Sequence, residues 1–252
     1  MDEVILQAKN LKKVFYSGKK SFTAVDNISF SIKKGECLGI VGESGSGKST
    51  VANMITRIVE PTEGKITLMG EDITELKGRK LKNIYRNIQM VFQMPHESFD
   101  PRRTLGDSIE ESLINYGTGR KEALQTAKEL LKKCGLSEEF YKKYSYEVSG
   151  GQCQRAAIAR AIALKPKVIV CDEATSALDV TVQKQVMELL LELKEKENIS
   201  FVLISHDLAL VQMFCDKVIV MHNGKAVETG TPDEIIKNPK ADYTKLLISS
   251  VL

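Results

Sequence analysis

Long uncharged segments are absent from the 252-residue sequence. Its longest stretch without Asp, Glu, Lys or Arg runs over ten residues, from Asn87 to His96, whereas a membrane-spanning helix needs about 18 or more apolar residues. The acidic start, Met1-Asp2-Glu3, and the lack of an apolar segment after it are unlike a secretory signal. We therefore expect a chain that crosses no bilayer and stays in the cytoplasm.

Residues that build disulfide frameworks and metal clusters are few and scattered. The three histidines lie far apart, and the odd number of cysteines includes no Cys-x-x-Cys pair. Neither a zinc site nor a disulfide framework is therefore predicted. The residues concerned are Cys37, Cys134, Cys153, Cys171, Cys215, His96, His206 and His222.

Charge of one sign is also scarce, because 36 basic and 33 acidic residues leave a net charge of +3. A dedicated nucleic-acid binder carries a larger basic excess, so no nucleic-acid partner is expected. With 42% hydrophobic and 27% charged residues, the composition is that of an ordinary globular protein. The length allows one or two domains with a core of their own.

Short apolar strands alternate with amphipathic helices along much of the chain, which predicts an α/β fold with a mostly parallel sheet. The clearest helix covers residues 180–197, where Val182, Val186, Leu189, Leu190 and Leu193 recur at helical spacing. The predicted buried strands consist mostly of Val, Ile, Leu or Phe and cover residues 37–41, 88–92, 168–171, 200–204 and 218–221.

Two parts of the chain depart from this alternation. Residues 3–34 alternate polar and apolar side chains at 21–25 and again at 28–32, and Asp26-Asn27 between them predicts separate antiparallel strands. Between Pro95 and about Lys165 the strand pattern disappears, and helical stretches near 121–134 and 151–164 dominate. We interpret residues 94–164 as a helical insertion, with residues 1–93 and 165–252 supplying the sheets.

A phosphate-binding pattern stands between a predicted strand, 37–41, and a predicted helix from Lys48 to about Ile58. Residues 42–49 fit Gly-x-x-x-x-Gly-Lys-Ser/Thr. The glycines let successive N–H groups turn toward phosphates, and the helix N-terminus adds positive potential. Lys48 would neutralise the β- and γ-phosphates of a nucleotide, Ser49 would bind Mg²⁺ and Thr50 would bond on the α-phosphate side. The predicted nucleotide contacts are Gly42, Glu43, Ser44, Gly45, Ser46, Gly47, Lys48, Ser49 and Thr50.

Two adjacent acids end the predicted strand at 168–171. Side chains alternate along a strand, so Asp172 and Glu173 at its end can take separate tasks. Asp172 would hold the magnesium shell, and Glu173 would reach toward a water as a base. Alone this pair is a weak signal, and it gains weight beside the phosphate loop.

A second anion-binding pattern opens the helix after residue 148, where the sequence reads Val-Ser-Gly-Gly-Gln-Cys-Gln-Arg. One nucleotide at residues 42–50 has no evident use for it. Here the chain resembles the ATPase subunits of ABC transporters, whose signature is Leu-Ser-Gly-Gly-Gln, over essentially its whole length. The resemblance implies one ABC ATPase domain over residues 1–252, with a P-loop NTPase (RecA-like) core, an N-terminal antiparallel β subdomain and a helical subdomain. Val148 and Cys153 are modest departures from the family pattern.

The resemblance also assigns roles across the subunit interface. In this family the signature of one subunit closes over the ATP that its partner holds, which implicates Ser149, Gly150, Gly151 and Gln152. Residues 176–179, Ser-Ala-Leu-Asp, resemble the loop that communicates across the dimer, so Asp179 joins the nucleotide contacts.

Three further positions gain a role from the resemblance. Gln93 follows the strand at 88–92 like the glutamine that contacts Mg²⁺ and the transmembrane partner, and His206 resembles the switch histidine at the γ-phosphate. An aromatic residue that stacks on adenine is expected upstream, and Phe15 fits best by its context, with Tyr16 a close rival.

Several stretches resemble the oligopeptide, dipeptide and nickel importer branch of the family. They are residues 42–48, 89–93 with 98–102, 173–183, and Asn238-Pro239 before 243–247. The resemblance implies import of a peptide, nickel or another metal chelate. Because this subunit does not touch the cargo, the sequence leaves the cargo open.

We therefore expect two ATPase subunits to hold two ATP·Mg²⁺ at their interface, and the family favours a different chain over an identical one as partner. Glu173 would deprotonate the attacking water, while His206 and Lys48 stabilise charge on the γ-phosphate. The motion would pass through Gln93 and residues 94–116 into transmembrane permease subunits, in a system with an extracytoplasmic solute-binding protein. The expected location is the cytoplasmic face of the cell membrane, as a peripheral subunit.

Two alternatives come from other functional classes. A soluble ABC ATPase acting on nucleic acid or ribosomes would usually carry a long coiled-coil insertion or two cassettes in one chain, which this sequence lacks. A P-loop phosphotransferase acting on a small molecule would leave residues 149–152 and His206 without a task.

Overall fold

The computed structural model describes residues 3–18, 20–175 and 178–249. Within these residues a central sheet has the order β10-β9-β3-β8-β7-β6. Adjacent strands are parallel from β9 to β6, and β10 joins β9 antiparallel. The strands predicted from apolar runs are all present. They are β3 (Cys37–Val41), β6 (Ile88–Val91), β7 (Val168–Asp172), β8 (Ser200–Ile204) and β9 (Lys217–His222), followed by β10 (Lys225–Gly230).

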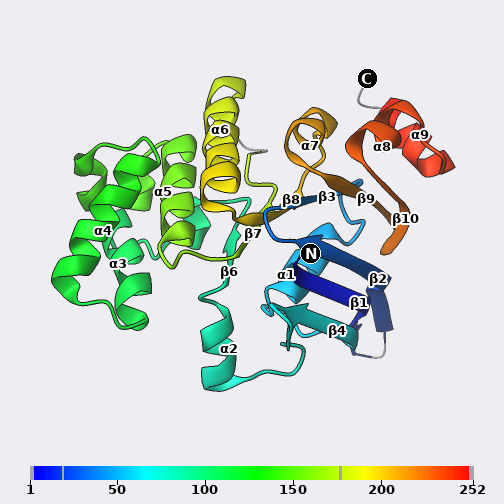
Figure 1. Ribbon diagram of the computed structural model, residues 1–252, viewed down its shortest axis with the longest axis horizontal. Helices are drawn as coiled ribbons and strands as arrows, with labels where there is room; N and C mark the ends of the chain where they lie inside the picture. Colours follow the sequence, from blue (N-terminus) through cyan, green and yellow to red (C-terminus); the bar gives the residue numbers. More distant parts are fainter. Residues whose placement is uncertain (1–2, 19, 176–177, 250–252) are drawn as a thin grey trace.

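A second sheet lies beside the first and has the order β2-β1-β4-β5. Its strands are β1 (Val4–Ser17), β2 (Lys20–Lys33), β4 (Glu63–Leu68) and β5 (Glu71–Asp72), and all pairs are antiparallel. The antiparallel N-terminal strands predicted from sequence are thus confirmed. This sheet is the dark blue and teal layer at the lower right of Figure 1.

The expected break at Asp26-Asn27 is wrong, because β2 runs through it as one strand. Leu11 pairs with Ile28 and Lys13 pairs with Val25, so two steps along β1 match three along β2. Asn27 takes φ +59°, and the extra residue forms a β-bulge rather than a turn. The bulge lets the Asp26 N–H donate to the Gly224 carbonyl at 2.8 Å, which ties the two sheets together.

Helices cover both faces of the central sheet, so its inner strands β3, β7 and β8 are buried throughout. In β7, Ile169 and Cys171 face the helices α5 and α6, while Val168 and Val170 face α1 and the second sheet. The helices are α1 (Lys48–Ile55), α2 (Gly78–Ile84), α3 (Leu105–Asn115), α4 (Arg120–Lys133), α5 (Gly150–Ile162), α6 (Val180–Glu197), α7 (Leu208–Phe214), α8 (Pro232–Lys237) and α9 (Asp242–Ser249).

The helices α3, α4 and α5 gather at one end of the molecule, at the left of Figure 1. The stretches predicted near 121–134 and 151–164 correspond to α4 and α5. Sequence reasoning did not single out α3, although Thr104 and Asp107 form a capping box at its N-terminus. Short 3-10 turns at His96–Ser98, Glu138–Lys142 and Ser145–Glu147 connect this group. No helix among the described residues is long and apolar enough to span a membrane.

The cysteines are all buried and free. Cys37 on β3 and Cys215 after α7 lie with their sulfur atoms 3.4 Å apart, although 178 residues separate them. Burial raises the pKa of the Cys134 and Cys171 thiols to about 12, so both stay protonated at neutral pH. These residues pack as small apolar side chains in the core.

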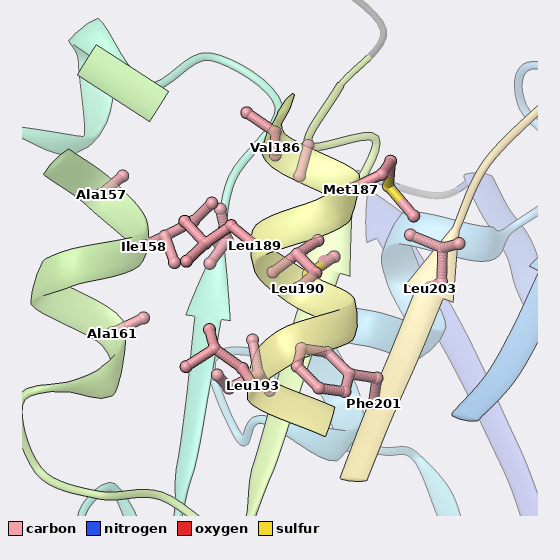
Figure 2. Close-up of a cluster of buried hydrophobic side chains, with 14 of the residues drawn as sticks. Ala157, Ile158, Ala161, Val186, Met187, Leu189, Leu190, Leu193, Phe201 and Leu203 are labelled. Atoms are coloured by element: carbon pink, nitrogen blue, oxygen red, sulfur yellow. The ribbon is translucent and has the colours of Figure 1, made fainter. Parts of the chain in front are cut away.

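Leu190 of α6 tests how much this core contributes to stability. Its side chain is fully buried, and Figure 2 shows it among the labelled apolar side chains of α5, α6 and β8. Leu190→Ala should lower the free energy of unfolding by about 2–5 kcal/mol, since it removes packing and leaves a cavity. Urea denaturation would measure the loss. Gln185→Ala, at an exposed position of the same helix, is the matched control and should change stability by less than about 0.5 kcal/mol. Equal losses in both variants would contradict the assigned core.

Candidate functional site

The phosphate loop connects the carboxyl end of β3 to α1, as the motif requires. Gly42 has φ +147°, and a Cβ there would lie 2.2 Å from the Met221 carbonyl oxygen. Gly47 has φ +101°, and its Cβ would lie 2.4 Å from the Ala24 carbonyl oxygen. Both close approaches are to backbone, so only glycine fits at these two positions. The loop is thus held against β9 on one side and β2 on the other.

Lys48 spans the loop from the first residue of α1. Its ammonium group donates to the carbonyls of Gly42, at 2.8 Å, and Glu43, at 2.7 Å. The residue is 5% exposed, and burial lowers the pKa of Lys48 although nearby carboxylates oppose that shift. The structure therefore holds a buried ammonium group beside a loop that can bind anions.

Acidic and amide side chains meet at the carboxyl edge of the parallel strands. Asp172 ends β7 and accepts a hydrogen bond from the Ser49 hydroxyl at 3.0 Å. The Gln93 side-chain amide donates to Glu173 Oε2 at 2.7 Å, and His206 Nδ1 lies 3.9 Å from the same oxygen. Gln93, Glu173 and His206 follow β6, β7 and β8, so neighbouring parallel strands bring them together.

Glu173 has an unusual backbone conformation for a residue with a side chain. Its φ is +47°, and its N–H donates to the Ile204 carbonyl at 3.1 Å. Left-handed conformations of this kind carry strain and concentrate at functional sites. The backbone is held there by a hydrogen bond to the end of β8, beside the loop that carries His206.

A cavity of about 360 Å³ opens above the phosphate loop. It is lined by Phe15, Phe22, Ala24, Ser44, Gly45, Gly47, Lys48, Ser49, Thr50, Gln93 and Glu173. Phe15 and Phe22 are direct cross-strand partners on β1 and β2, and both rings are exposed. Tyr16, the rival to Phe15 for an adenine contact, is not among the lining residues.

Phe22 and Ala24, both on β2, are the lining residues that sequence reasoning missed. The alternation at residues 21–25 indicated a strand but did not indicate which residue faces Phe15. That pairing depends on the register of β1 and β2, which includes several shifts.

The oxygen donors at this edge suit a magnesium ion. Mg²⁺ prefers oxygen ligands, and several of its ligands are usually water or phosphate oxygens. The Ser49 hydroxyl oxygen and the nearer carboxylate oxygen of Asp172 lie 3.0 Å apart. Burial raises the pKa of Asp172, although Ser49 and Lys48 oppose that shift, and a bound cation would further favour its charged form. No cluster of three or more His, Cys, Asp or Glu residues suited to a metal occurs in the described part of the chain.

The segment 149–152 lies apart from this cavity. Ser149 caps α5, because its hydroxyl accepts from the Gln152 N–H at 3.4 Å and its own N–H donates to Gln152 Oε1 at 2.9 Å. A Cβ on Gly151 would lie 2.2 Å from Val182 Cγ1, so α5 and α6 pack closely there. Among the described residues, none of this segment lines the phosphate-loop cavity.

The remaining sequence-predicted positions also have defined structural places. Asp179 caps α6 by accepting from the Val182 N–H at 3.0 Å, and it does not line the cavity either. Ser176 and Ala177 of the same predicted loop lie outside the described residues. Cys153 is fully buried on α5, and burial raises its pKa to about 12. A cysteine is therefore compatible with this position, because the side chain faces the core.

Comparisons with known proteins agree on one family. The family model for ABC transporters matches residues 25–176. The oligopeptide transport ATP-binding protein OppF of Salmonella typhimurium is 43% identical over 251 residues, covering 99% of this chain and 75% of that protein. The oligopeptide transport ATP-binding protein AppF of Bacillus subtilis is 45% identical over 258 residues, covering 99% of this chain and 78% of that protein.

Solved structures show the same fold. The dimeric structure of MJ0796, a bacterial ABC transporter cassette, has a TM-score of 0.83 and 32% identity, with 90% of this chain and 99% of that chain covered. A dimeric post-hydrolysis state of the MJ0796 cassette bound to ADP and phosphate has a TM-score of 0.82 and 31% identity, with the same coverage. The expected P-loop NTPase fold is therefore confirmed.

Gly47→Ala tests the close packing of the phosphate loop. The new methyl group would meet the Ala24 carbonyl, so the loop must move away from β2 and its N–H groups lose their alignment. We expect nucleotide affinity to fall at least tenfold, measured by calorimetric titration. Gly117→Ala is the matched control, because Gly117 has a similar φ of +97° but open space around it. It should cost about 1–2 kcal/mol of stability and leave nucleotide affinity unchanged; an equal loss of affinity would contradict the packing argument.

Proposed function

Because the chain belongs to the ABC transporter ATPase family, we propose that its hydrolysis of ATP to ADP and phosphate powers the import of peptides across a membrane. The observation that carries this proposal is the convergence of the phosphate loop, Asp172, Glu173, Gln93 and His206 at one sheet edge. The names of the relatives, which are oligopeptide transport proteins, favour a peptide over nickel or another metal chelate as cargo.

In this proposal the phosphate loop binds the ATP phosphates through its N–H groups, and Lys48 neutralises them. Lys48 now donates to the Gly42 and Glu43 carbonyls, so its ammonium group is already directed into the loop. Ser49, Gln93 and Asp172 would hold Mg²⁺, which supplies charge neutralisation at the phosphates when bound. Phe15, with Phe22 beside it, would stack on adenine at the mouth of the cavity.

Glu173 is the proposed general base. Its carboxylate faces Gln93 and lies near His206, and its side chain is largely shielded from solvent, with 19% exposure. A carboxylate in this position can accept a proton from a water that attacks the γ-phosphate. His206, whose ring is 62% exposed, is free to reach toward the γ-phosphate and stabilise charge there.

Half of each ATP site would come from a second ABC ATPase subunit, identical or different. Ser149 to Gln152 and Asp179 lie outside the cavity of their own chain, which is the arrangement expected if they act on a partner's nucleotide. The positive N-terminus of α5 is suited to the γ-phosphate side of that nucleotide. The two similar solved cassettes described above are dimers.

A groove of about 390 Å³ between β6 and the helical segment is the proposed contact with a transmembrane permease subunit. Ile58, Phe92 and Tyr116 line it, and Ile58 is 51% exposed. Phe92 adjoins Gln93, so a helix seated in the groove would sense movement of the ATP site. In this proposal the chain is a peripheral subunit at the cytoplasmic face of the membrane, in a system that also has an extracytoplasmic solute-binding protein.

Replacing Glu173 tests the proposed base. Glu173→Gln keeps the hydrogen-bonding shape but cannot accept a proton, so ATP binding and ATP-dependent association should persist while turnover falls at least a hundredfold. Phosphate release would measure turnover, and light scattering would measure ATP-dependent association. Glu188→Gln on the exposed face of α6 is the control and should match the wild type. Near-normal turnover of Glu173→Gln would remove Glu173 from the role of base.

Charge placed in the groove tests the permease contact. Ile58→Glu should abolish co-purification with the permease subunits, because the contact would then have to desolvate a carboxylate where it now buries an exposed apolar side chain. ATP affinity of the isolated chain should stay unchanged. Leu124→Glu, on α4 and 39% exposed, is the matched control outside the groove. Normal assembly of the Ile58→Glu transporter would show that the permease binds elsewhere.

A further inference from the structure

The C-terminal segment that resembles the importer branch, residues 238–247, has no task in the mechanism above. It starts at Asn238, the C-cap of α8, and includes most of α9. Both helices lie beside β10 at the right of Figure 1. The resemblance assigned no role to the residues of this segment. Their contacts in the structure indicate one.

Tyr243 of α9 reaches the phosphate loop. Its hydroxyl accepts a hydrogen bond from the Glu43 N–H at 3.1 Å, across 200 residues of sequence. Its ring stacks on His222, with ring centroids 3.9 Å apart and an angle of 29° between the planes. His222 ends β9, directly after Met221, against whose carbonyl Gly42 packs.

Both backbone polar groups of Glu43 are therefore hydrogen-bonded, one to a residue outside the loop and one to a residue that follows it on α1. Tyr243 holds the N–H of Glu43, and the ammonium group of Lys48 holds its carbonyl. Further along, the Ser46 carbonyl accepts from the Gly224 N–H at 3.0 Å. Gly224 lies between β9 and β10, so the same C-terminal part of the fold holds the loop at two points.

The position of Tyr243 is itself fixed independently of the loop. The carboxylate of Glu228 on β10 accepts from the N–H groups of Lys240 and Ala241, at 2.9 and 3.0 Å, just before α9 begins. Leu247 and Ile248 of α9 are buried in the larger hydrophobic core. These contacts do not involve the Tyr243 hydroxyl, so its removal leaves α9 in place.

We propose that Tyr243 is a positioning residue for ATP binding: its hydroxyl fixes the peptide at Glu43, and through it the alignment of the phosphate loop and Lys48. The inference rests on the proposed nucleotide site but assigns a role beyond it. Without this hydrogen bond, the peptide group before Glu43 can rotate in the nucleotide-free chain. The N–H groups of the loop and the Lys48 side chain must then be ordered when the phosphates bind. Ordering on binding weakens affinity and leaves later chemical steps unchanged.

Tyr243→Phe is the critical variant, because it keeps the ring on His222 and removes only the hydroxyl. We expect ADP and ATP to bind the isolated chain about fivefold more weakly, a factor that corresponds to about 1 kcal/mol. In the assembled transporter, KM for ATP should rise by the same factor while kcat stays within about twofold. Calorimetric titration and steady-state phosphate release would measure these values.

Tyr85→Phe is the matched control, since Tyr85 is also half-buried and its hydroxyl donates to a backbone carbonyl, that of Arg57. In the isolated chain it should leave nucleotide affinity unchanged, and both variants should show similar thermal midpoints without nucleotide. A merely structural role for Tyr243 would lower the fraction of competent sites and kcat but not the affinity of the remaining sites. Wild-type affinity in Tyr243→Phe would overturn the inference alone, whereas failure of the wild-type chain to bind nucleotide would overturn the proposed function.

Discussion

The close packing of the phosphate loop against two separate backbone carbonyls is the constraint on which the site depends. Gly42 meets Met221 of the central sheet, and Gly47 meets Ala24 of the antiparallel sheet. The loop therefore takes its shape only where both sheets are in place. Hydrogen bonds from Asp26 to Gly224 and from Gly224 to Ser46 join the sheets at the same point. An anion site made of backbone N–H groups needs this support, because its affinity depends on N–H groups that already point toward the anion rather than on net charge.

The parallel sheet then sets the chemistry around the loop. Neighbouring strands end at one edge, so Gln93, Glu173 and His206 meet although more than 100 residues separate the first from the last. The site also holds opposite charges away from water, since burial lowers the pKa of Lys48 and raises that of Asp172. Both shifts disfavour the charged forms, and a bound nucleotide with its cation would relieve them together.

The position of the signature segment, residues 149–152, outside the cavity fits the proposal that a second subunit completes the ATP site. Gly151 packs closely on Val182, so α5 and α6 are in close contact there. Ser149 and Gln152 satisfy each other's backbone N–H groups at the exposed end of α5. Within one chain these residues serve helix capping. The same N–H-rich end is available to an anion on another molecule, so one set of residues can serve both stability and assembly.

The sequence by itself determined the elements whose pattern is local: the buried strands, the long helix α6, the glycine-rich loop with Lys48 and the acids that end β7. These follow from side-chain periodicity and from motifs within a few residues. Only the tertiary structure decided that Asp26-Asn27 forms a bulge, that Phe22 lies opposite Phe15, and that Tyr243 contacts Glu43. Each of these depends on strand register or on contact between distant segments. A sequence read locally does not contain them, because they arise from the free energy of packing the whole chain.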